Sequence, residues 1–200
     1  MSVDRPPFNP PSSPPPFLES ERVYLRGLEE KDLDGPYLQW LNDAVVCAGN
    51  SHHVYPYSRA QALQYVQGVA GDKSQVVLAV VAREGDRHIG NIALSAIHPL
   101  YRSAQFSILM GDRAYWGKGY AHDAATLLLQ HGFAALNLHR IECGTFATNH
   151  AMRKLALALG MREEGVRRAA AWKSGAYLDV VEFGILREEF ARSVAFAPPS

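Results

Sequence analysis

The chain has 200 residues, of which 48% are hydrophobic and 20% charged, and this length and composition predict one globular domain. Its 20 lysines and arginines balance its 20 aspartates and glutamates, which disfavours a dedicated DNA-binding protein or a binder of anionic membranes. Two cysteines, Cys47 and Cys143, are too few for a disulfide framework or a four-cysteine zinc site, so they indicate a reducing compartment. We therefore expect a cytoplasmic protein that binds neither nucleic acid nor membrane and needs no metal.

Both ends of the chain are expected to lie outside the folded domain. Residues 1–16 contain seven of the twelve prolines, and proline removes the amide donor that helices and inner strands require. This composition predicts a disordered or polyproline-like leader, with a docking motif for a proline-binding partner as the alternative. Residues 191–200 are expected to form a C-terminal tail, which leaves 17–190 as the domain.

Between these tails, stretches that alternate apolar and polar residues are typical of strands, and apolar residues three and four apart are typical of helices. The longest such helix repeat, from Ala121 to Phe133, predicts an amphipathic helix, and Ser58 with Gln61 predicts a capping box before another. In chain order we expect a strand at 21–26, a helix at 36–41, a second helix through 62–69, strands at 75–83, 87–97 and 103–110, a helix at 120–136, a strand at 140–147, a helix at 149–159, and strands at 164–173 and 178–186. The alternation predicts an α/β domain.

Residues 116–121 (WGKGYA) lie between a predicted strand and the longest predicted helix. Glycines at such a junction let a ligand approach the backbone, and the unpaired first-turn amides carry the positive end of the helix dipole. The combination predicts a phosphate or pyrophosphate site with Lys118 as an added charge, while a tight turn without a ligand is the alternative.

Two better-known phosphate motifs do not fit this segment. A Walker loop needs four residues between its glycines, but five separate Gly111 from Gly117, and Lys118 lacks the following Ser or Thr. The dinucleotide fingerprint needs a third small residue where this chain has His122.

Three stretches together resemble the Rim-type branch of the GNAT superfamily of acyl-CoA-dependent N-acetyltransferases: GDRAYWGKGYAHDA, HGFAALNLHRIECGTFATNHAMRKLALALGMREEGVRR and WKSGAYLDVVEFGILREEF. This branch includes acetyltransferases of ribosomal-protein N-termini, of polyamines, and of amino-sugars or sugar nucleotides. The resemblance spans residues 17–190 and implies a mixed, mostly antiparallel sheet that splays between flanking helices (α+β), with acetyl-CoA as co-substrate. Many members dimerise, so the resemblance leaves a homodimer open.

The resemblance also implies which residues bind coenzyme A. The main chain near Leu109 and Met110 would pair with the pantetheine arm, and Asn149 would hydrogen-bond the same arm or simply cap its helix. The family's pyrophosphate signature, Q/R-x-x-G-x-G/A, falls on Trp116, Gly117, Lys118, Gly119, Tyr120 and Ala121.

Acetyl transfer from a thioester to an amine needs a neutral amine and a proton for the departing thiolate. The positions where relatives often carry a Tyr or Ser acid are Ala156 and Met152, neither of which donates a proton. Another residue, a water or unassisted departure must therefore substitute. Gln105 replaces a glutamate that is frequent in the branch, and Glu142 is a weak catalytic candidate, acting through water, with a solvated or paired carboxylate as the alternative.

The loop AGNSHHVYPY, residues 48–57, is expected to border the acceptor cleft, as it does in the family. Its candidates for substrate contact are His52, His53 and Tyr55, joined by Trp172 and Asp179 of the last hairpin; two surface histidines and simple hairpin packing are the alternatives. The acidic run Glu29, Glu30, Asp32 and Asp34 indicates a solvated helix start, or else attraction for a cationic acceptor.

The function expected from this reading is acetyl transfer by direct attack in a ternary complex. The aromatic and histidine-rich loop favours a small-molecule amine acceptor, such as an amino-sugar or sugar nucleotide. The alternatives are acetylation of a protein N-terminus and a non-catalytic module that binds acyl-CoA.

Overall fold

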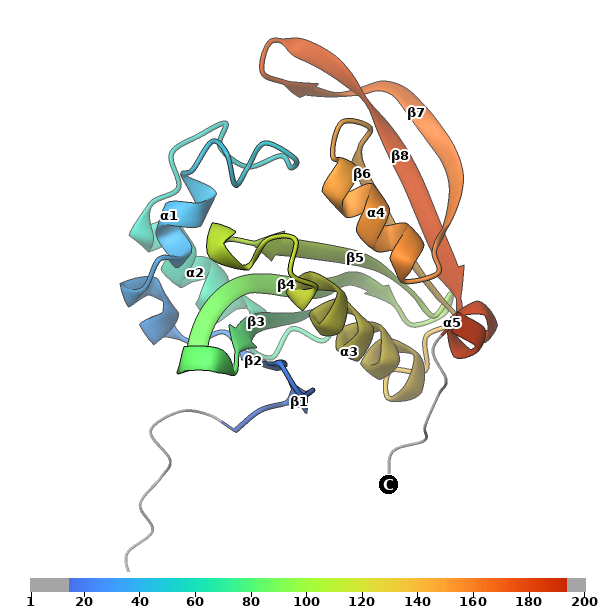
Figure 1. Cartoon of the computed structure of the whole chain (residues 1–200), viewed down its shortest axis with the longest axis horizontal. Coiled ribbons are helices and arrows are strands. Elements are labelled where there is room, and N and C mark those ends of the chain that lie inside the picture. The colour runs from blue at the N-terminus through green and yellow to red at the C-terminus, as the bar shows by residue number, and fades with distance from the viewer. Residues whose placement is uncertain (1–14, 194–200) are drawn as a thin grey trace, which may run out of the picture.

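The computed structural model describes residues 15–193 and contains one eight-stranded sheet in the order β1-β2-β3-β4-β5-β6-β8-β7 (Figure 1). Its strands are β1 (Leu18–Glu19), β2 (Val23–Gly27), β3 (Val76–Ala82), β4 (Arg87–His98), β5 (Ser103–Met110), β6 (Arg140–Phe146), β7 (Arg162–Lys173) and β8 (Ala176–Leu186). Its α-helices are α1 (Tyr37–Leu41), α2 (Arg59–Val69), α3 (Tyr120–Ala134), α4 (His150–Ala158) and α5 (Arg187–Ser193), with short 3-10 helices at Glu30–Asp34, Glu84–Asp86 and Arg113–Tyr115. The tails predicted at 1–16 and 191–200 fall almost wholly outside the described residues.

Helices cover both faces of the sheet (Figure 1). The apolar stripe of α3, which includes Ala125, Leu128 and Phe133, is buried in the main core against strands β2 to β6. On the other face, α1 and α2 enclose a smaller core around Tyr37 and Trp40. Both stripes follow the helical spacing of the sequence, because burying apolar side chains is what holds an amphipathic helix against a sheet.

The sheet opens between β5 and β6. These strands are parallel and pair only through Ser103–Gln105 and Arg140–Glu142, whereas every other neighbouring pair among the described strands is antiparallel. Beyond Gln105 the two strands separate, so each presents an edge to the gap between them. The predicted mixed, mostly antiparallel and splayed sheet is confirmed.

Local signals placed most elements within one or two residues. Ser58 and Gln61 form the predicted capping box, and Gly160, which follows α4, takes the left-handed conformation that favours glycine. The helix α5 was not predicted, and it runs to Ser193, past the expected domain end at Phe190. The buried Phe190 ring lies 5.2 Å from that of Phe133, so this helix closes the main core.

Cys47 and Cys143 are both buried and unpaired, as their small number predicted. Among the described helices, none has the length and apolar character needed to cross a bilayer.

Candidate active site

The predicted phosphate cradle is formed by the turn between β5 and α3. Gly117 and Gly119 have φ angles of 70° and 87°, in the left-handed region that favours glycine, and Gly119 is the N-cap of α3 without a side-chain cap. Within the described residues, none of the main-chain N–H groups from Gly117 to His122 donates to a protein acceptor. These free donors at the positive end of a 15-residue helix suit an anion such as a diphosphate.

Arg22, at the start of β2, fixes this turn from a distant part of the sequence. Its guanidinium donates to the Lys118 carbonyl at 3.0 Å, pairs with Asp123 of α3 at 2.7 Å, and lies over the Tyr120 ring. Sequence reasoning missed Arg22, because no local pattern shows that β2 begins beside the cradle. It adds a second cation near Lys118.

The end of β5, which carries Leu109 and Met110, lies beside the opened gap, and pairing of its main chain with a pantetheine arm stays a prediction. The Met110 carbonyl accepts a hydrogen bond from the Trp116 indole at 2.8 Å, which ties the first residue of the cradle to the strand. Leu109 lines the neighbouring cavity. The cradle and this strand edge therefore lie next to one another, as a ligand that spans both would require.

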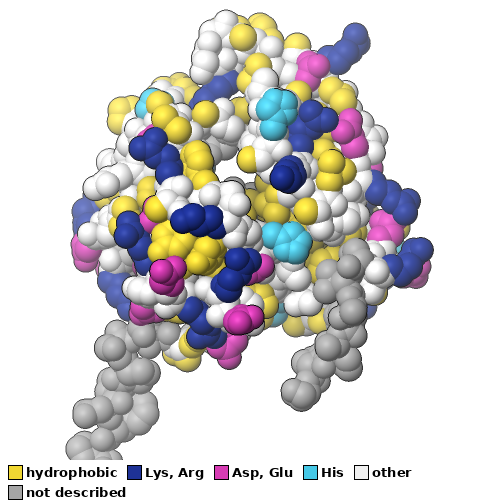
Figure 2. All heavy atoms as spheres, in the orientation of Figure 1, with side chains coloured by type: hydrophobic (Ala, Val, Ile, Leu, Met, Phe, Trp, Pro, Cys, Tyr) yellow, Lys and Arg dark blue, Asp and Glu magenta, His cyan; other side chains and the backbone are white. Residues whose placement is uncertain are grey.

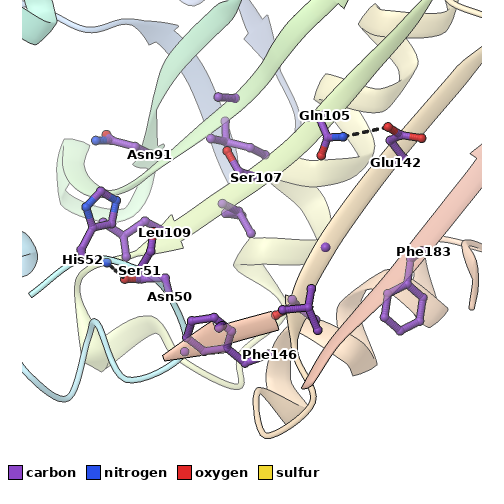
Figure 3. A pocket seen from close by; sticks show the side chains of 18 of the residues that line it. Asn50, Ser51, His52, Asn91, Gln105, Ser107, Leu109, Glu142, Phe146 and Phe183 are labelled. Atoms are coloured by element: carbon purple, nitrogen blue, oxygen red, sulfur yellow. Dashed lines mark hydrogen bonds between the residues drawn. The ribbon is translucent and has the colours of Figure 1, made fainter. Parts of the chain in front are cut away.

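A cavity of about 1080 Å³ occupies the gap between the two halves of the sheet. Figure 2 shows a hollow between these halves on the face of α3 and α4, with lysine and arginine side chains around it. In Figure 3, Gln105 and Ser107 of β5 face Glu142 and Phe146 of β6, while His52 reaches the cavity from the α1–α2 loop. The cavity thus touches both strand edges and the loop.

The floor of the cavity consists of ion pairs within and among strands β6, β7 and β8, joined to β5 by one hydrogen bond. Glu142 accepts from Gln105 at 2.7 Å and from Arg140 at 2.9 Å, one bond to each carboxylate oxygen. Arg140 also pairs with Glu164 of β7, and this hydrogen bond holds the pKa of Glu164 below its ordinary value. We call these contacts, together with the pair of Glu182 and Arg167, the floor ion pairs.

Two glycines inside strands make room for the floor ion pairs. A Cβ at Gly144 would lie 2.8 Å from the Glu182 carboxylate, and one at Gly184 would lie 2.5 Å from the Arg140 guanidinium. A glycine in a strand interior weakens the strand and often marks a close approach of another group. Gly144 and Gly184 were therefore the signal that could have located this cluster from the sequence.

Three tyrosines line the wall of the cavity beneath the loop: Tyr37, Tyr57 and Tyr65. Burial raises the pKa of each phenol, so all three are uncharged at neutral pH. We call them the cavity tyrosines. They offer flat apolar surface together with hydroxyl groups.

The α1–α2 loop is attached to both halves of the sheet (Figure 1). At its base, the Asn42 side chain bonds both main-chain groups of Tyr57 at 2.8 Å. At its tip, Asn149 donates to the Gly49 carbonyl at 3.0 Å, and Lys173 of β7 donates to the His52 carbonyl at 2.6 Å. The loop consequently bridges the cavity.

Asn149 caps helix α4, which is the simpler of its two predicted roles. Its side-chain oxygen accepts from the Met152 amide at 3.1 Å and so caps α4. Its amide group is engaged with Gly49, and a Cβ at Gly49 would lie 2.4 Å from that nitrogen. A contact of Asn149 with a cofactor arm stays a prediction.

Of the residues predicted to contact substrate, the structure brings only His52 to the cavity. His53 and Tyr55 do not line it, and Tyr55 is 82% exposed. Trp172 packs edge-on against Tyr177 at the exposed tip of the β7–β8 hairpin. Asp179 accepts from the Ala169 amide at 2.8 Å, at the point where the β7 register shifts.

The two positions where relatives often carry the acid that protonates the leaving thiolate, Met152 and Ala156, cannot supply a proton in this structure either. Ala156 is fully buried in the main core, and Met152 packs against that core. Among the described residues, no group of three or more His, Cys, Asp or Glu side chains could hold a metal ion. Any proton for the leaving sulfur must come from another side of the cavity or from water.

A sheet that opens beside an uncapped, glycine-rich helix start, with a cavity across the opening, defines the fold of the GNAT acyltransferases. The family model for the acetyltransferase (GNAT) domain matches residues 22–162. The chain therefore belongs to the GNAT acetyltransferase family, and the predicted family and enzyme class are confirmed.

Relatives and solved structures agree with this assignment. The chain is 29% identical over 175 residues to p20 of Bacillus licheniformis, an uncharacterized N-acetyltransferase, covering 87% of this chain and 98% of that protein. It is 31% identical over 102 residues to a spermidine N(1)-acetyltransferase of Vibrio cholerae, covering 51% of this chain and 58% of that protein. A structure of the Vibrio cholerae spermidine N-acetyltransferase with CoA and spermine superposes with a TM-score of 0.77 at 25% identity, covering 86% of this chain and 99% of that one. Mycobacterium smegmatis RimJ in complex with CoA-disulfide shares the fold, with a TM-score of 0.75 at 19% identity over 86% of this chain and 88% of that one.

Proposed function

We propose that this protein transfers the acetyl group of acetyl-CoA to a primary amine of a small molecule, by direct attack within a ternary complex. The observation that carries the proposal is the bridged cavity at the split between β5 and β6, which adjoins an uncapped anion cradle. The cradle and the cavity provide separate places for a nucleotide-bearing thioester and for its acceptor.

The free amides at 117–122 suit the pyrophosphate of coenzyme A, and Lys118 and Arg22 supply positive charge beside them. On the side that faces the gap, β5 has no strand partner from Phe106 to Leu109, so its main-chain polar groups on that side are available to a pantetheine arm. This arrangement leads the arm from the cradle towards the cavity. Solved relatives with coenzyme A bound support the same assignment.

The bridged cavity favours a small acceptor over a polypeptide. The loop contacts through Asn149 and Lys173 close the cavity from above, whereas a protein tail needs an open groove. Its volume, about 1080 Å³, is in the range of pockets for small molecules.

The charge of the floor favours a cationic acceptor. Three carboxylates, Glu142, Glu164 and Glu182, face two guanidiniums, so one negative charge is left over for a second ammonium group. A short aliphatic polyamine carries such a second ammonium group, which the excess negative charge would attract. Spermidine acetyltransferases are among the relatives. An amino-sugar is the second candidate, because the cavity tyrosines offer the flat surface and hydroxyls that bind sugars.

The test measures thiol release from acetyl-CoA with three acceptors in turn: spermidine, glucosamine and a short peptide that begins with alanine. Release with spermidine or glucosamine but not with the peptide is the expected result. Release with the peptide alone would overturn the small-molecule assignment. Binding of coenzyme A in calorimetry without release for any of a broad set of amines would favour the non-catalytic module instead.

The polyamine assignment has its own matched pair of variants. Glu182→Gln removes a carboxylate from the floor, whereas Glu163→Gln removes one that pairs with Arg153 outside the cavity. Losing one partly exposed charge contact should raise the KM for spermidine roughly 2- to 10-fold in the first variant only, with kcat unchanged. An equal KM in both variants would count against recognition of a second ammonium by the floor.

A further inference from the structure

We propose that His52 is the proton carrier of the reaction, taking the proton that the amine nitrogen loses and returning it to the departing sulfur. This inference rests on the proposed acetyl transfer and assigns its missing acid. It depends on where the imidazole lies, on how its backbone is fixed, and on what surrounds it.

Both main-chain polar groups of His52 are fixed. Its N–H donates to the Asn50 side chain at 2.9 Å, and its carbonyl accepts from Lys173 at 2.6 Å. The loop that carries it is attached at its base by Asn42 and at its tip by Asn149. Catalytic side chains need this kind of support, because a loosely placed base is seldom in reach of its proton.

The ring of His52 lines the cavity, while that of its neighbour does not. His53 has a φ of 62°, an uncommon conformation for a residue with a side chain, and this turn sends the two histidines in different directions. Strained positions of this kind cluster at functional sites. The ring nitrogens of His52 make no hydrogen bond within the described residues, so they are available to a ligand.

His52 is unprotonated at neutral pH. His52 is exposed as a whole residue, but partial burial of the ring at the cavity lowers the pKa of its imidazole, and the nearby charge of Lys173 lowers it further. The other charged or titratable groups around the cavity are the floor ion pairs and the cavity tyrosines, and the tyrosines are uncharged because their pKa values are raised. The Nε2 atom of His88 contacts the Gly90 carbonyl and the Asn91 side chain, and its Nδ1 atom lies 3.5 Å from the buried Asp32 carboxylate, so both ring nitrogens are directed at protein groups.

Starting from the neutral amine, which has already released the proton of its ammonium form to water, the proton balance of the transfer needs no second group. The amine nitrogen forms a bond to the thioester carbonyl carbon, and the carbon–sulfur bond breaks with its electron pair on sulfur. The nitrogen gives one proton to the neutral imidazole, and the imidazolium gives the same proton to the sulfur. The products are an amide and a thiol, with His52 returned to its starting state. One residue thus performs what Met152 and Ala156 cannot.

The experiment compares His52→Gln with His53→Asn, a matched control that keeps a residue tolerant of positive φ at the neighbouring position. The readouts are kcat for the best acceptor, coenzyme A binding by calorimetry, and the pH dependence of kcat/KM. General acid–base catalysis contributes about 10²- to 10⁴-fold, so kcat should fall by that factor in His52→Gln and stay near the wild-type value in His53→Asn. Coenzyme A binding should be unchanged in both.

The pH profile separates a proton carrier from a residue that only shapes the loop. In the wild type, activity should fall as the pH drops through the lowered pKa of His52. Lys173→Met removes the charge that lowers this pKa, so the acid limb should move upward, whereas Lys173→Arg should leave it in place.

Three results would overturn the assignment in different ways. A wild-type enzyme that acetylates no amine would remove the proposed function itself. Turnover of the wild type with an unchanged kcat in His52→Gln would leave acetyl transfer intact and exclude His52. A lower kcat in His52→Gln, combined with an acid limb that Lys173→Met does not move, would reduce His52 to a structural part of the loop.

Discussion

Substituting Gly119 by alanine should separate the cradle from the rest of the fold. Gly119 is the N-cap of α3 with a φ of 87°, and an added Cβ would lie 2.9 Å from the Arg22 guanidinium. A side chain in the left-handed region costs about 1–2 kcal/mol. Without ligand, the turn of the Gly119→Ala variant can relax and escape this strain. Binding then has to restore the strained conformation, so the free energy of binding becomes less favourable by the same amount. A loss of about 1–2 kcal/mol corresponds to a roughly 5- to 30-fold weaker affinity for coenzyme A.

The matched control is Gly175→Ala, in the turn between β7 and β8. Gly175 has a φ of 82°, and its Cβ would meet nothing within 4 Å, so this substitution imposes the same backbone strain away from the cradle. Urea unfolding should show the full loss of stability, about 1–2 kcal/mol, in Gly175→Ala, and a smaller loss in Gly119→Ala because its turn relaxes when no ligand is bound. Calorimetry should show weaker coenzyme A binding in Gly119→Ala alone. Equal affinity in the two variants, with a smaller loss of stability in Gly119→Ala than in Gly175→Ala, would refute the assignment of the 117–122 amides to the diphosphate.

Three further substitutions test the fold and the cradle. Asp32→Asn breaks the buried pair with Arg26, whose side chains are 4% and 7% exposed, and should cost about 3–5 kcal/mol in urea unfolding at pH 7. Burial acts to raise the pKa of Asp32, but hydrogen bonds from Arg26 and from the backbone outweigh it and lower the pKa. The stabilisation by this pair is therefore present above about pH 4 and is lost as the pH falls through the lowered pKa. A wild-type advantage over Asp32→Asn that persists in stronger acid would contradict this. Arg22→Ala removes a cation and the ion pair with Asp123 beside the cradle. Calorimetry should therefore show coenzyme A binding that is about 3- to 10-fold weaker and depends less on salt concentration. An unchanged salt dependence would argue against a direct charge effect of Arg22. Leu128→Ala leaves a cavity at a fully buried position on the inner face of α3 and should lower the free energy of unfolding in urea by about 2–5 kcal/mol. A loss below about 1 kcal/mol would mean that the core refills the space.

The acidic run after the second strand shows how a local pattern can mislead. Four carboxylates within six residues predicted a solvated helix start, and a short 3-10 helix does begin there. Asp32, however, is buried and bonded to Arg26. Arg26 belongs to the alternating pattern of β2, and the sequence gives no sign that its side chain turns back to meet Asp32. The pairing depends on the packing of α1 and α2 over that face of the sheet.

His52 and His53 show within the site that a local sequence pattern does not determine which side chain reaches the cavity. Adjacent residues on a loop look equivalent in the sequence, yet only His52 reaches the cavity, because the backbone turns at His53. The floor ion pairs depend on register: Gln105 lies opposite Glu142, and Gly144 opposite Glu182. A shift of one residue would move each of these side chains to the other face of the sheet.

The sequence by itself determined the chain order of the strands from β2 onward and of the helices as far as α4, the capping box at Ser58, and the glycine-rich turn before α3. These features depend on the side-chain period and the backbone conformations of a few consecutive residues, which the sequence specifies directly. Only the tertiary structure decided which carboxylates share the cavity floor, that Arg22 supports the cradle, and that a loop anchored by Asn149 and Lys173 places His52 at the split between β5 and β6. Those contacts join residues up to 121 positions apart, and they form only once the strands have paired in one register and the two halves of the sheet have separated.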